Sequence, residues 1–418
     1  MAHLGFLCPE LSGHLHPMMS LARAAQRRGH AVTFYQRPYS CPRVSAAGFA
    51  CRAYGEREFP VPVFKAHLAR LAGLSGRPAL AYTARLFDLQ ARALMRDVPP
   101  MLRADRVDLL VVDQALGAGS TVAALAGLPF AVVCNALALD AEPGVPPFCV
   151  DWAYRPGWVG RARNRVGYGL LRTAAAPVFR SMNAVRRRRG LPEIRDFAGL
   201  AGGAQAVVCQ QPKEFDFPRA ALPPAFRYVG PMVEPDVRPP APFPWDRLDP
   251  GRPLIYASMG TLQNGVRKTF GTIAAACDRL GAQLVISLGG GGDPAALGKL
   301  PGDPVVVGFA PQLDLIRRAA LVVTHAGLNT ALECLSAGVP MVAIPVTNDQ
   351  PGVAARIRHV GAGEFVPLRS LDVASLRDRV KRVMREGRYR DAARKMRDAI
   401  GQCGGAEEGA RVLEGAVG

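Results

Sequence analysis

The residues best placed to do chemistry lie in the stretch LVVTHAGLNTALECLSAGVPMVAIPVTNDQ, residues 321–350. Its first part predicts a buried strand that ends near Val323, followed by a turn at Gly327 that opens a helix. Small and polar residues at a helix start leave backbone N–H groups free, and these favour a bound anion. His325, Asn329 and Thr330 add side-chain donors at the same point, so the stretch predicts a site for a phosphate or diphosphate.

Carboxylates and amides follow at spacings that suit sugar hydroxyls. Glu333 lies one helical turn after Asn329 on the same face, where its carboxylate could accept hydrogen bonds from ribose. Asp349 and Gln350 follow the next predicted strand and offer the acceptor and amide groups that sugar hydroxyls require. Taken singly, His325 could be a helix cap, the glutamate a solvated helix residue and the last pair plain turn residues. Together they favour one ligand that carries both phosphate and hydroxyl groups.

A second candidate is SGHLHPMM, residues 12–19, which has two histidines two residues apart where a strand gives way to a helix. We expect an extended segment here, with at most one of His14 and His16 facing a cleft. The other is then expected to be an ordinary structural residue.

These two regions need a framework of strands and helices to hold them. Short Val-, Leu- and Ala-rich runs alternate with longer helical patterns, which predicts buried parallel strands and an α/β fold. The expected strands lie within residues 3–9, 31–37, 107–114, 129–136, 205–212, 253–261, 282–290, 304–311, 321–327 and 340–347. Ligands bind beyond the carboxyl ends of strands in such sheets, so two domains that face each other would enclose a cleft.

The division into domains follows from length and proline content. A chain of 418 residues exceeds one compact core. The stretch VEPDVRPPAPFPWDRLDPGRP can form neither a helix nor a central strand, so it predicts a linker. We therefore expect a first Rossmann-like domain over residues 1–236, a linker over 237–252, a second Rossmann-like domain over 253–385 and a closing helical segment over 386–418.

The composition excludes several classes of protein. A hydrophobic fraction of 49% with 21% charged residues is typical of a folded chain and not of a disordered one. No apolar run reaches membrane-spanning length and no secretory signal is visible, so we expect a cytoplasmic protein. Nine cysteines without a C-x-x-C pair argue against a disulfide framework and a zinc site, and reduced thiols are expected. The net charge of +18 comes without a nucleic-acid-binding motif, which argues against a nucleic-acid partner.

The stretch HAGLNTALECLSAGVPMVAIPVTNDQ, residues 325–350, resembles the nucleotide-sugar signature of the UDP-glycosyltransferase superfamily, inverting enzymes of the GT-B fold. The resemblance extends over essentially the whole chain. Phe309 stands where that family has an aromatic residue stacked on uracil, and SMGT, residues 258–261, resembles the loop whose backbone meets the β-phosphate. The donor-binding residues that the resemblance and the patterns imply are Ser258, Gly260, Thr261, Phe309, Gln312, His325, Gly327, Asn329, Thr330, Glu333, Asp349 and Gln350.

Three further stretches, EFDFPRAALPPAFRYVGPM, SMGTLQ and DQPGVAARI, are similar to the zeaxanthin (carotenoid) glucosyltransferase branch of that superfamily. Leu328 and Phe309 depart from the plant pattern, because tryptophan is usual at both positions. These departures leave the base and the sugar of the donor open and do not affect the expected fold.

The resemblance also implies roles in catalysis. His14, directly after Gly13, matches the general base of the family, and Asp113, at the end of VDLLVVD, matches its partner carboxylate. For Asp113 the alternative is an aspartate that caps the following helix. His16 has no counterpart and is expected to be structural or peripheral. The chain contains no D-x-D motif for a metal, so the helix N-terminus and His325 are expected to stabilise the leaving diphosphate.

We therefore expect an inverting glycosyltransferase that needs no cofactor and no metal. It would move glucose from UDP-glucose to a hydroxyl of an apolar acceptor, a hydroxylated carotenoid such as zeaxanthin. A polyketide, macrolide or phenolic aglycone is the alternative acceptor. A sugar-nucleotide epimerase and a basic surface-binding protein are the alternatives outside this reaction class.

Residues 158–189, WVGRARNRVGYGLLRTAAAPVFRSMNAVRRRR, form a basic amphipathic pattern that predicts helix interrupted at Pro177. Such stretches can lie on anionic membranes, so a peripheral contact at the inner membrane face is one interpretation. A helical pair that covers the first sheet, with a solvated arginine face, is the other.

Overall fold

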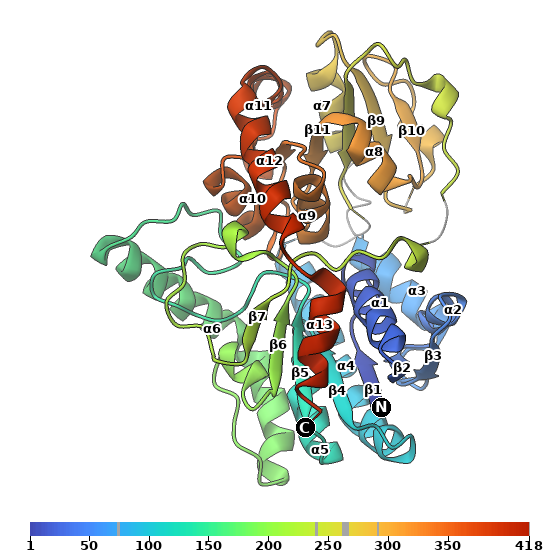
Figure 1. Cartoon of the computed structure of the whole chain (residues 1–418), viewed down its shortest axis with the longest axis vertical. Coiled ribbons are helices and arrows are strands. Elements are labelled where there is room, and N and C mark those ends of the chain that lie inside the picture. The colour runs from blue at the N-terminus through green and yellow to red at the C-terminus, as the bar shows by residue number, and fades with distance from the viewer. Residues whose placement is uncertain (73–75, 239–240, 261–266, 291, 418) are drawn as a thin grey trace.

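The chain forms two parallel β-sheets, one from each half of the sequence, in a computed structural model that describes residues 1–72, 76–238, 241–260, 267–290 and 292–417 (Figure 1). Successive strand residues point to different cores: Leu110 and Val112 join one buried cluster of the first domain, whereas Leu109 and Val111 join the other. Both faces of this sheet are therefore covered, which explains the continuous apolar runs of its strands.

The first sheet has seven parallel strands in the order β3-β2-β1-β4-β5-β6-β7. Its strands are β1 (His3–Leu7), β2 (Ala31–Gln36), β3 (Ala50–Ala53), β4 (Leu109–Asp113), β5 (Phe130–Cys134), β6 (Ala206–Cys209) and β7 (Phe226–Tyr228). Its helices are α1 (Ser12–Arg27), α2 (Cys41–Ala46), α3 (Val61–Ala72), α4 (Gly76–Ala104), α5 (Gly119–Ala126) and α6 (Trp158–Arg188). The strand order reverses between β1 and β4, and a crevice is expected at the carboxyl ends of these two strands.

The second sheet has six parallel strands in the order β10-β9-β8-β11-β12-β13. Its strands are β8 (Leu254–Ser258), β9 (Gln283–Ser287), β10 (Val305–Val307), β11 (Ala319–Thr324), β12 (Met341–Ala343) and β13 (Gly363–Phe365). The helices that follow are α7 (Arg267–Cys277), α8 (Gln312–Arg318), α9 (Leu328–Ser336), α10 (Gln350–His359), α11 (Val373–Arg385), α12 (Gly387–Gly401) and α13 (Gly405–Glu414). The order reverses between β8 and β11, as it does between β1 and β4.

The predicted α/β fold with two Rossmann-like domains is confirmed, and all ten expected strands are present. The strands that the sequence did not predict are β3, β7 and β13, which have 4, 3 and 3 residues and lie at sheet edges. Each is partly exposed, so its sequence lacks the long apolar run that marks the central strands.

The last helix ties the two ends of the chain together. Whereas α12 packs on α9 in the second domain, α13 returns to the first domain and packs along α1 (Figure 1). Ala410 and Leu413 of α13 join the same buried cluster as Leu21 of α1. At the surface, Arg28 donates hydrogen bonds of 2.8 and 2.5 Å to the Glu414 carboxylate. The carboxyl-terminal segment thus closes the fold by joining both domains.

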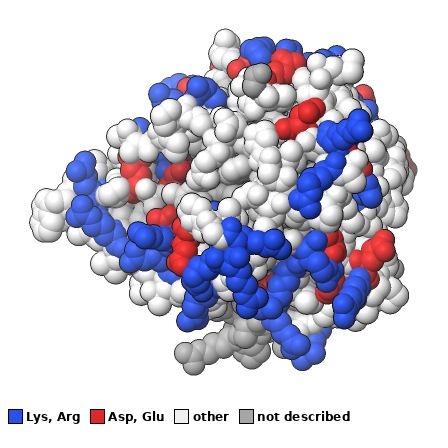
Figure 2. All heavy atoms as spheres, turned by 90° about the horizontal axis from the view of Figure 1, so that it is seen from below, with Lys and Arg blue, Asp and Glu red and all other residues white. Residues whose placement is uncertain are grey.

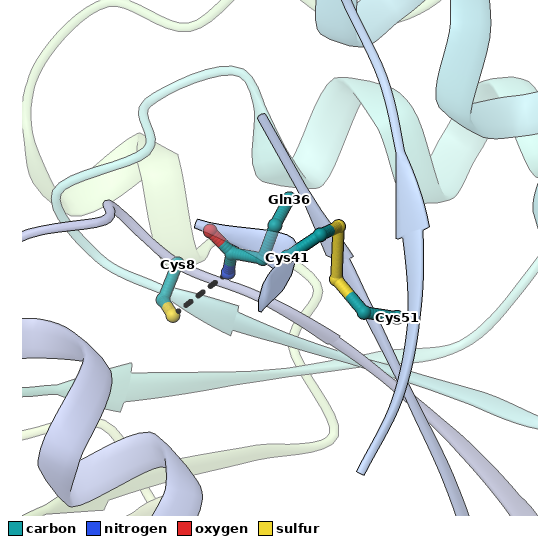
Figure 3. Close-up of a disulfide and its surroundings, with 4 residues drawn as sticks. All are labelled: Cys8, Gln36, Cys41 and Cys51. Atoms are coloured by element: carbon teal, nitrogen blue, oxygen red, sulfur yellow. Dashed lines mark hydrogen bonds between the residues drawn. A yellow bond between two sulfur atoms is a disulfide. The ribbon is translucent and has the colours of Figure 1, made fainter. Parts of the chain in front are cut away.

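Cys41 and Cys51 form a disulfide, with their Cα atoms 5.6 Å apart (Figure 3). The expectation that all the thiols are reduced is therefore wrong. The two cysteines are ten residues apart, and the packing of α2 on β3 brings Cys51 beside Cys41 at the start of α2. Beside this disulfide, Gln36 donates a 3.2 Å hydrogen bond to the Cys8 sulfur.

Helix α6 runs without a break through Pro177, so the predicted interruption there is wrong. Proline lacks the N–H that would bond to the carbonyl of Thr173. Both residues are exposed, and water can bond to that carbonyl instead. Within the described ranges, no helix is long and apolar enough to cross a membrane.

Candidate active site

A cavity of about 650 Å³ lies between the two domains, at the carboxyl ends of both sheets. Of the fourteen predicted site residues, the twelve that line this cavity are His14, Ser258, Gly260, Phe309, Gln312, His325, Gly327, Asn329, Thr330, Glu333, Asp349 and Gln350. Asp113 lies behind His14, and Thr261 lies outside the described residues. The cavity wall thus contains residues from segments more than 300 positions apart.

The two reversals of strand order explain why these residues meet. His14 follows β1, and Asp113 ends the neighbouring strand β4, in which Val112 pairs with Leu7. In the second sheet, Ser258 of β8 pairs with Thr324 of β11, so Gly260 and His325 leave the sheet side by side. Each domain therefore presents its own crevice to the other.

His14 and Asp113 form the central polar contact of the first domain. The His14 Nδ1 atom lies 2.7 Å from Asp113 Oδ2, and the carboxylate is fully buried. Because an ionised carboxylate only accepts hydrogen bonds, Nδ1 carries the proton in this pair and Nε2 is left as an acceptor. Both histidines of SGHLHPMM lie in the first turns of α1, which begins at Ser12, so the extended segment predicted there is wrong.

The Asp113 carboxylate is held by two further donors. Asn135 Nδ2 donates a 2.7 Å bond to Oδ2, and the backbone N–H of Ala115 donates a 2.8 Å bond to Oδ1. The following helix, α5, begins at Gly119 with Ala118 as its N-cap and has no side-chain cap. The alternative that Asp113 caps this helix is therefore wrong. Asn135, which the sequence analysis missed, lines the cavity as well.

The two histidines differ in their electrostatic surroundings. Burial lowers the pKa of His14, but the Asp113 carboxylate, with smaller contributions from Asp349 and Glu10, outweighs this and raises the pKa above the usual value for histidine. Burial and nearby arginines lower the pKa of His16 to about 3. His16 also lines the cavity, so its predicted peripheral position is wrong, but no carboxylate is bonded to it in the described part of the chain.

His325 lies between two glycines of the second domain. A Cβ atom at Gly260 would come within 2.7 Å of the imidazole, and one at Gly327 within 2.5 Å of its Nε2 atom. Gly260 also has a φ of +75°, which favours glycine over any other residue. Burial lowers the pKa of His325 to about 4, so the ring is neutral at pH 7. Its Nδ1 atom is buried without a hydrogen-bond partner in the described structure.

The first turn of α9 faces the same cavity. Four consecutive residues line it: Gly327, Leu328, Asn329 and Thr330. The N-cap residue is Gly327, which has no side chain that could cap the free N–H groups of the helix. The first intrahelical bond goes from the N–H of Ala331 to the carbonyl of Gly327, which leaves the N–H groups of the preceding turn free. The helix start, with the neutral imidazole of His325 beside it, forms a site rich in donors. Within the residues described, no group of three His, Cys, Asp or Glu side chains could hold a metal ion.

Glu333 is already engaged by two donors. Arg238 Nη2 lies 2.5 Å from Oε1, and Gln312 Nε2 lies 2.6 Å from Oε2. The carboxylate is only 3% exposed, and each oxygen keeps a second lone pair for a ligand. Arg238 comes from the proline-rich stretch between the domains, and an isolated arginine there gave no signal in the sequence.

Asn329 bonds to the first domain, a contact that the sequence did not predict. Its Nδ2 atom donates a 2.6 Å bond to the carbonyl of Gly13, and its Oδ1 atom accepts a 2.7 Å bond from Gln210. Gln210 also donates a 2.8 Å bond to the carbonyl of Asn135. The carboxamide therefore connects the start of α9 with the residue before His14.

The remaining predicted residues are partly committed to the framework. The side-chain oxygen of Gln350 accepts bonds of 2.9 and 3.0 Å from the N–H groups of Val346 and Thr347, so only its amide NH₂ is left for a ligand. Asp349 accepts a 3.2 Å bond from the N–H of Leu137, and burial raises the pKa of its carboxyl. Phe309 lies in the cavity wall and is 44% exposed.

Comparison with known proteins gives consistent matches. The family described as UDP-glucoronosyl and UDP-glucosyl transferase matches residues 195–398. A zeaxanthin glucosyltransferase of Pseudescherichia vulneris is 30% identical over 423 residues, covering 100% of this chain and 98% of that protein. A 4'-demethylrebeccamycin synthase of Lentzea aerocolonigenes is 28% identical over 424 residues, covering 97% of each chain. The crystal structure of the calicheamicin glycosyltransferase CalG4 has a TM-score of 0.75 at 22% identity and covers 100% of this chain and 98% of that one. The arrangement of the two domains is thus the GT-B fold.

Proposed function

The chain belongs to the UDP-glucoronosyl and UDP-glucosyl transferase family and is a glycosyltransferase, and we propose that it transfers glucose from UDP-glucose to a hydroxyl of an apolar acceptor such as zeaxanthin. The observation that carries this proposal is the pair formed by His14, which lines the same cavity as His325 and the start of α9, and the buried Asp113 behind it. A base from one domain thus faces a donor-rich anion site from the other.

In the proposed reaction, Nε2 of His14 takes the proton of the acceptor hydroxyl while that oxygen attacks the anomeric carbon. The bond from this carbon to the β-phosphate oxygen breaks with its electron pair, and the nucleoside diphosphate leaves. Attack from the side opposite the leaving group inverts the configuration. Asp113 holds the imidazole by the bond to Nδ1 and stabilises the imidazolium that forms.

The leaving diphosphate is proposed to bind at the first turn of α9. Its charge would be stabilised by the free N–H groups there and by His325, which is neutral and acts through an N–H donor. Gly260 and Gly327 lack the Cβ atoms that would collide with the imidazole, so the ring can lie close to the backbone of both residues. We therefore propose that the transfer needs no metal ion and no other cofactor.

The rest of the donor is assigned by the chemistry of the remaining wall. Phe309 is proposed to stack on the base, Glu333 to accept hydrogen bonds from ribose, and Asp349 and Gln350 to contact the hexose hydroxyls. Ser258, which ends β8, and Gly260 just after it are proposed to meet the β-phosphate with their backbone. Asn329 is left out of this assignment, because its carboxamide is committed to Gly13 and Gln210.

The acceptor is proposed from the relative that is named a zeaxanthin glucosyltransferase, at 30% identity. The second candidate is a polyketide, macrolide or phenolic aglycone, which is favoured by the 28% identical relative that is named a 4'-demethylrebeccamycin synthase. Mass analysis of products would separate them, with UDP- and dTDP-sugars offered against zeaxanthin in mixed micelles and against soluble phenols and macrolides. Faster transfer to a soluble phenol than to zeaxanthin would rule out the carotenoid proposal.

A further inference from the structure

The amino-terminal half of α6 exposes a group of large apolar side chains. Trp158 is 81% exposed, Val159 53%, Val166 65% and Leu170 68%. These four belong to a set of eleven exposed large hydrophobic residues in the described chain, and no other segment contributes as many within thirteen positions. A cluster of this kind on one helix indicates an interaction surface.

The four side chains share one side of the helix. Trp158, Val166 and Leu170 are spaced by multiples of four residues, and Val159 lies about 100° from Trp158 around the axis. On the opposite side of the helix, the residues Gly160, Asn164 and Gly167 are buried against the protein. Gly167 packs against Pro147 and Trp152, and Asn164 donates a 3.0 Å bond to the carbonyl of Pro143. The apolar stripe therefore points outward, and this end of α6 projects from the body of the protein (Figure 1).

Arginines accompany this stripe. Arg161, Arg165 and Arg172 lie on the helix side next to it, and Arg155 precedes the helix start. All four are exposed, and none forms an ion pair with an acidic side chain of the described chain. Their charge is thus available to a partner. Trp, Val and Leu beside unpaired arginines form the pattern of a helix that lies in the surface of an anionic bilayer.

We propose that this surface, formed by Arg155, Trp158, Val159, Arg161, Arg165, Val166, Leu170 and Arg172, docks the protein on anionic phospholipid membranes. The arginines would contact phosphate groups while Trp158, Val166 and Leu170 enter the headgroup boundary. A projecting helix can lie flat on a bilayer, whereas a protein partner of this stripe would need a matching groove.

The docking surface is joined to the catalytic cavity by one segment. Asn135 and Ala136 line the cavity, and the chain from there runs to Trp158 at the start of α6. The same segment contacts the second domain, because the N–H of Leu137 bonds to Asp349. Docking would therefore act on a helix that is continuous in sequence with part of the cavity wall. Membrane binding itself does not depend on the proposed acceptor and is measured separately from transfer.

The test is co-sedimentation of the full-length protein with vesicles of phosphatidylglycerol and phosphatidylcholine, compared with vesicles of phosphatidylcholine alone. We expect binding to the anionic vesicles that weakens as salt is raised. The triple variant Arg161→Gln, Arg165→Gln and Arg172→Gln should lose about 100-fold in partition, from roughly five-fold per charge. The variant Trp158→Ser, Val166→Ser and Leu170→Ser should lose binding while all its charges remain.

A matched control is needed because the chain carries a net charge of +18. Lys and Arg also gather on the face shown in Figure 2, which is the molecule of Figure 1 seen from below. Replacement of Arg187, Arg188 and Arg189 by Gln removes the same net charge at the other end of α6, where Arg188 lies about 24 Å along the helix from Arg172. This variant should keep most of the binding. An unchanged unfolding midpoint would show that each variant is folded.

Two results would overturn the proposal. If the protein binds neither the anionic nor the neutral vesicles, a lipid membrane is excluded as the partner of the apolar stripe, and a protein partner is left. Equal losses in the Arg161, Arg165 and Arg172 variant and in its Arg187, Arg188 and Arg189 control would assign the attraction to overall charge. A blue shift of tryptophan fluorescence with anionic vesicles, lost in Trp158→Ser, would support insertion of this side chain.

Discussion

The side-chain amide of Asn329 donates a 2.6 Å hydrogen bond to the backbone carbonyl of Gly13, the residue before His14. The bond joins the first turn of α9, in the second domain, to the start of α1 in the first. At the other end of the same carboxamide, Gln210 Nε2 donates a 2.7 Å hydrogen bond to the Asn329 Oδ1 atom. The Asn329 side chain therefore helps to set the distance between the proposed base and the proposed diphosphate site.

Replacement of Asn329 by Ala should lower kcat by about 10- to 100-fold, because a displacement of about 1 Å between reacting groups can cost that much. The donor KM should change little. Ser336→Ala is the control, since it removes a 2.8 Å side-chain bond at the far end of the same helix. A raised donor KM with unchanged kcat would show that Asn329 acts on the diphosphate, as the sequence suggested.

Replacement of His14 by Ala should lower kcat by about 10²- to 10⁴-fold, the usual contribution of a positioned general base. Donor affinity, measured by calorimetry with UDP-glucose, should be nearly unchanged, because the donor site lies in the other domain. His16→Ala is the matched control: the residue lines the same cavity but bonds to no carboxylate in the described chain. Equal losses in the two variants would mean that the base is assigned wrongly.

The Asp113–His14 pair predicts a particular pH dependence. The base acts only when it is neutral, and the raised pKa of His14 keeps it protonated to a higher pH than a free imidazole. The acid limb of kcat/KM should therefore have its midpoint above about 6.5, the value of an unperturbed histidine. Asp113→Asn removes the carboxylate charge and should shift this midpoint to lower pH while it also lowers kcat.

Asn135→Ala serves as the control for this shift. Asn135 donates to the same oxygen of Asp113, but its loss leaves the carboxylate charge in place. The acid limb of kcat/KM in Asn135→Ala should therefore have its midpoint at a higher pH than the acid limb in Asp113→Asn. An acid limb that is the same in the wild type and in Asp113→Asn would show that another group titrates.

Transfer should persist after treatment with a chelator and should not increase when Mg²⁺ or Mn²⁺ is added. The reason is that the free N–H groups at the start of α9, with His325 beside them, supply donors where a metal would otherwise neutralise the diphosphate. His325→Ala should raise the donor KM under both conditions. Activity that appears only with added metal would contradict this assignment.

The central strands and most of the cavity wall could be predicted because they depend on local sequence. Buried parallel strands have continuous apolar runs, and the polar residues that follow them necessarily meet at the carboxyl edge of a sheet. The histidines of SGHLHPMM were placed in the right region but in the wrong backbone conformation, since the helix begins at Ser12. The domain limits proposed from the proline-rich stretch stay a prediction.

Contacts across the domain boundary could not be predicted, because they depend on how the two domains are oriented. The stretches EFDFP and DQPGVAARI are an example: Asp216 accepts bonds of 2.9 and 2.7 Å from Arg356, and the guanidinium lies 4.4 Å from the centre of the Phe217 ring. Both members of this ion pair are 1% exposed. Nothing in either stretch alone indicates its partner 140 residues away.

The contact of Arg238 with Glu333 has the same origin and bears on the donor. Glu333→Gln keeps the shape of the side chain but removes the charge that Arg238 and Gln312 face. It should raise the KM of UDP-glucose about ten-fold or more, since hydrogen bonds that involve a charged group are the stronger ones. The kcat should change less, because ribose is bound equally in the ground state and the transition state.

The donor series that decides this prediction compares UDP-glucose with its 2'-deoxy and 3'-deoxy ribose analogues. If Glu333 accepts from ribose, the analogue that lacks the contacted hydroxyl should have a raised KM with the wild type and little further increase with Glu333→Gln. If Glu333→Gln raises the KM of both analogues by the same factor as it raises the KM of UDP-glucose, Glu333 acts only by holding Arg238 and Gln312 in place. Glu333 would then be a positioning residue, and the ribose contact would have to be sought elsewhere in the cavity wall.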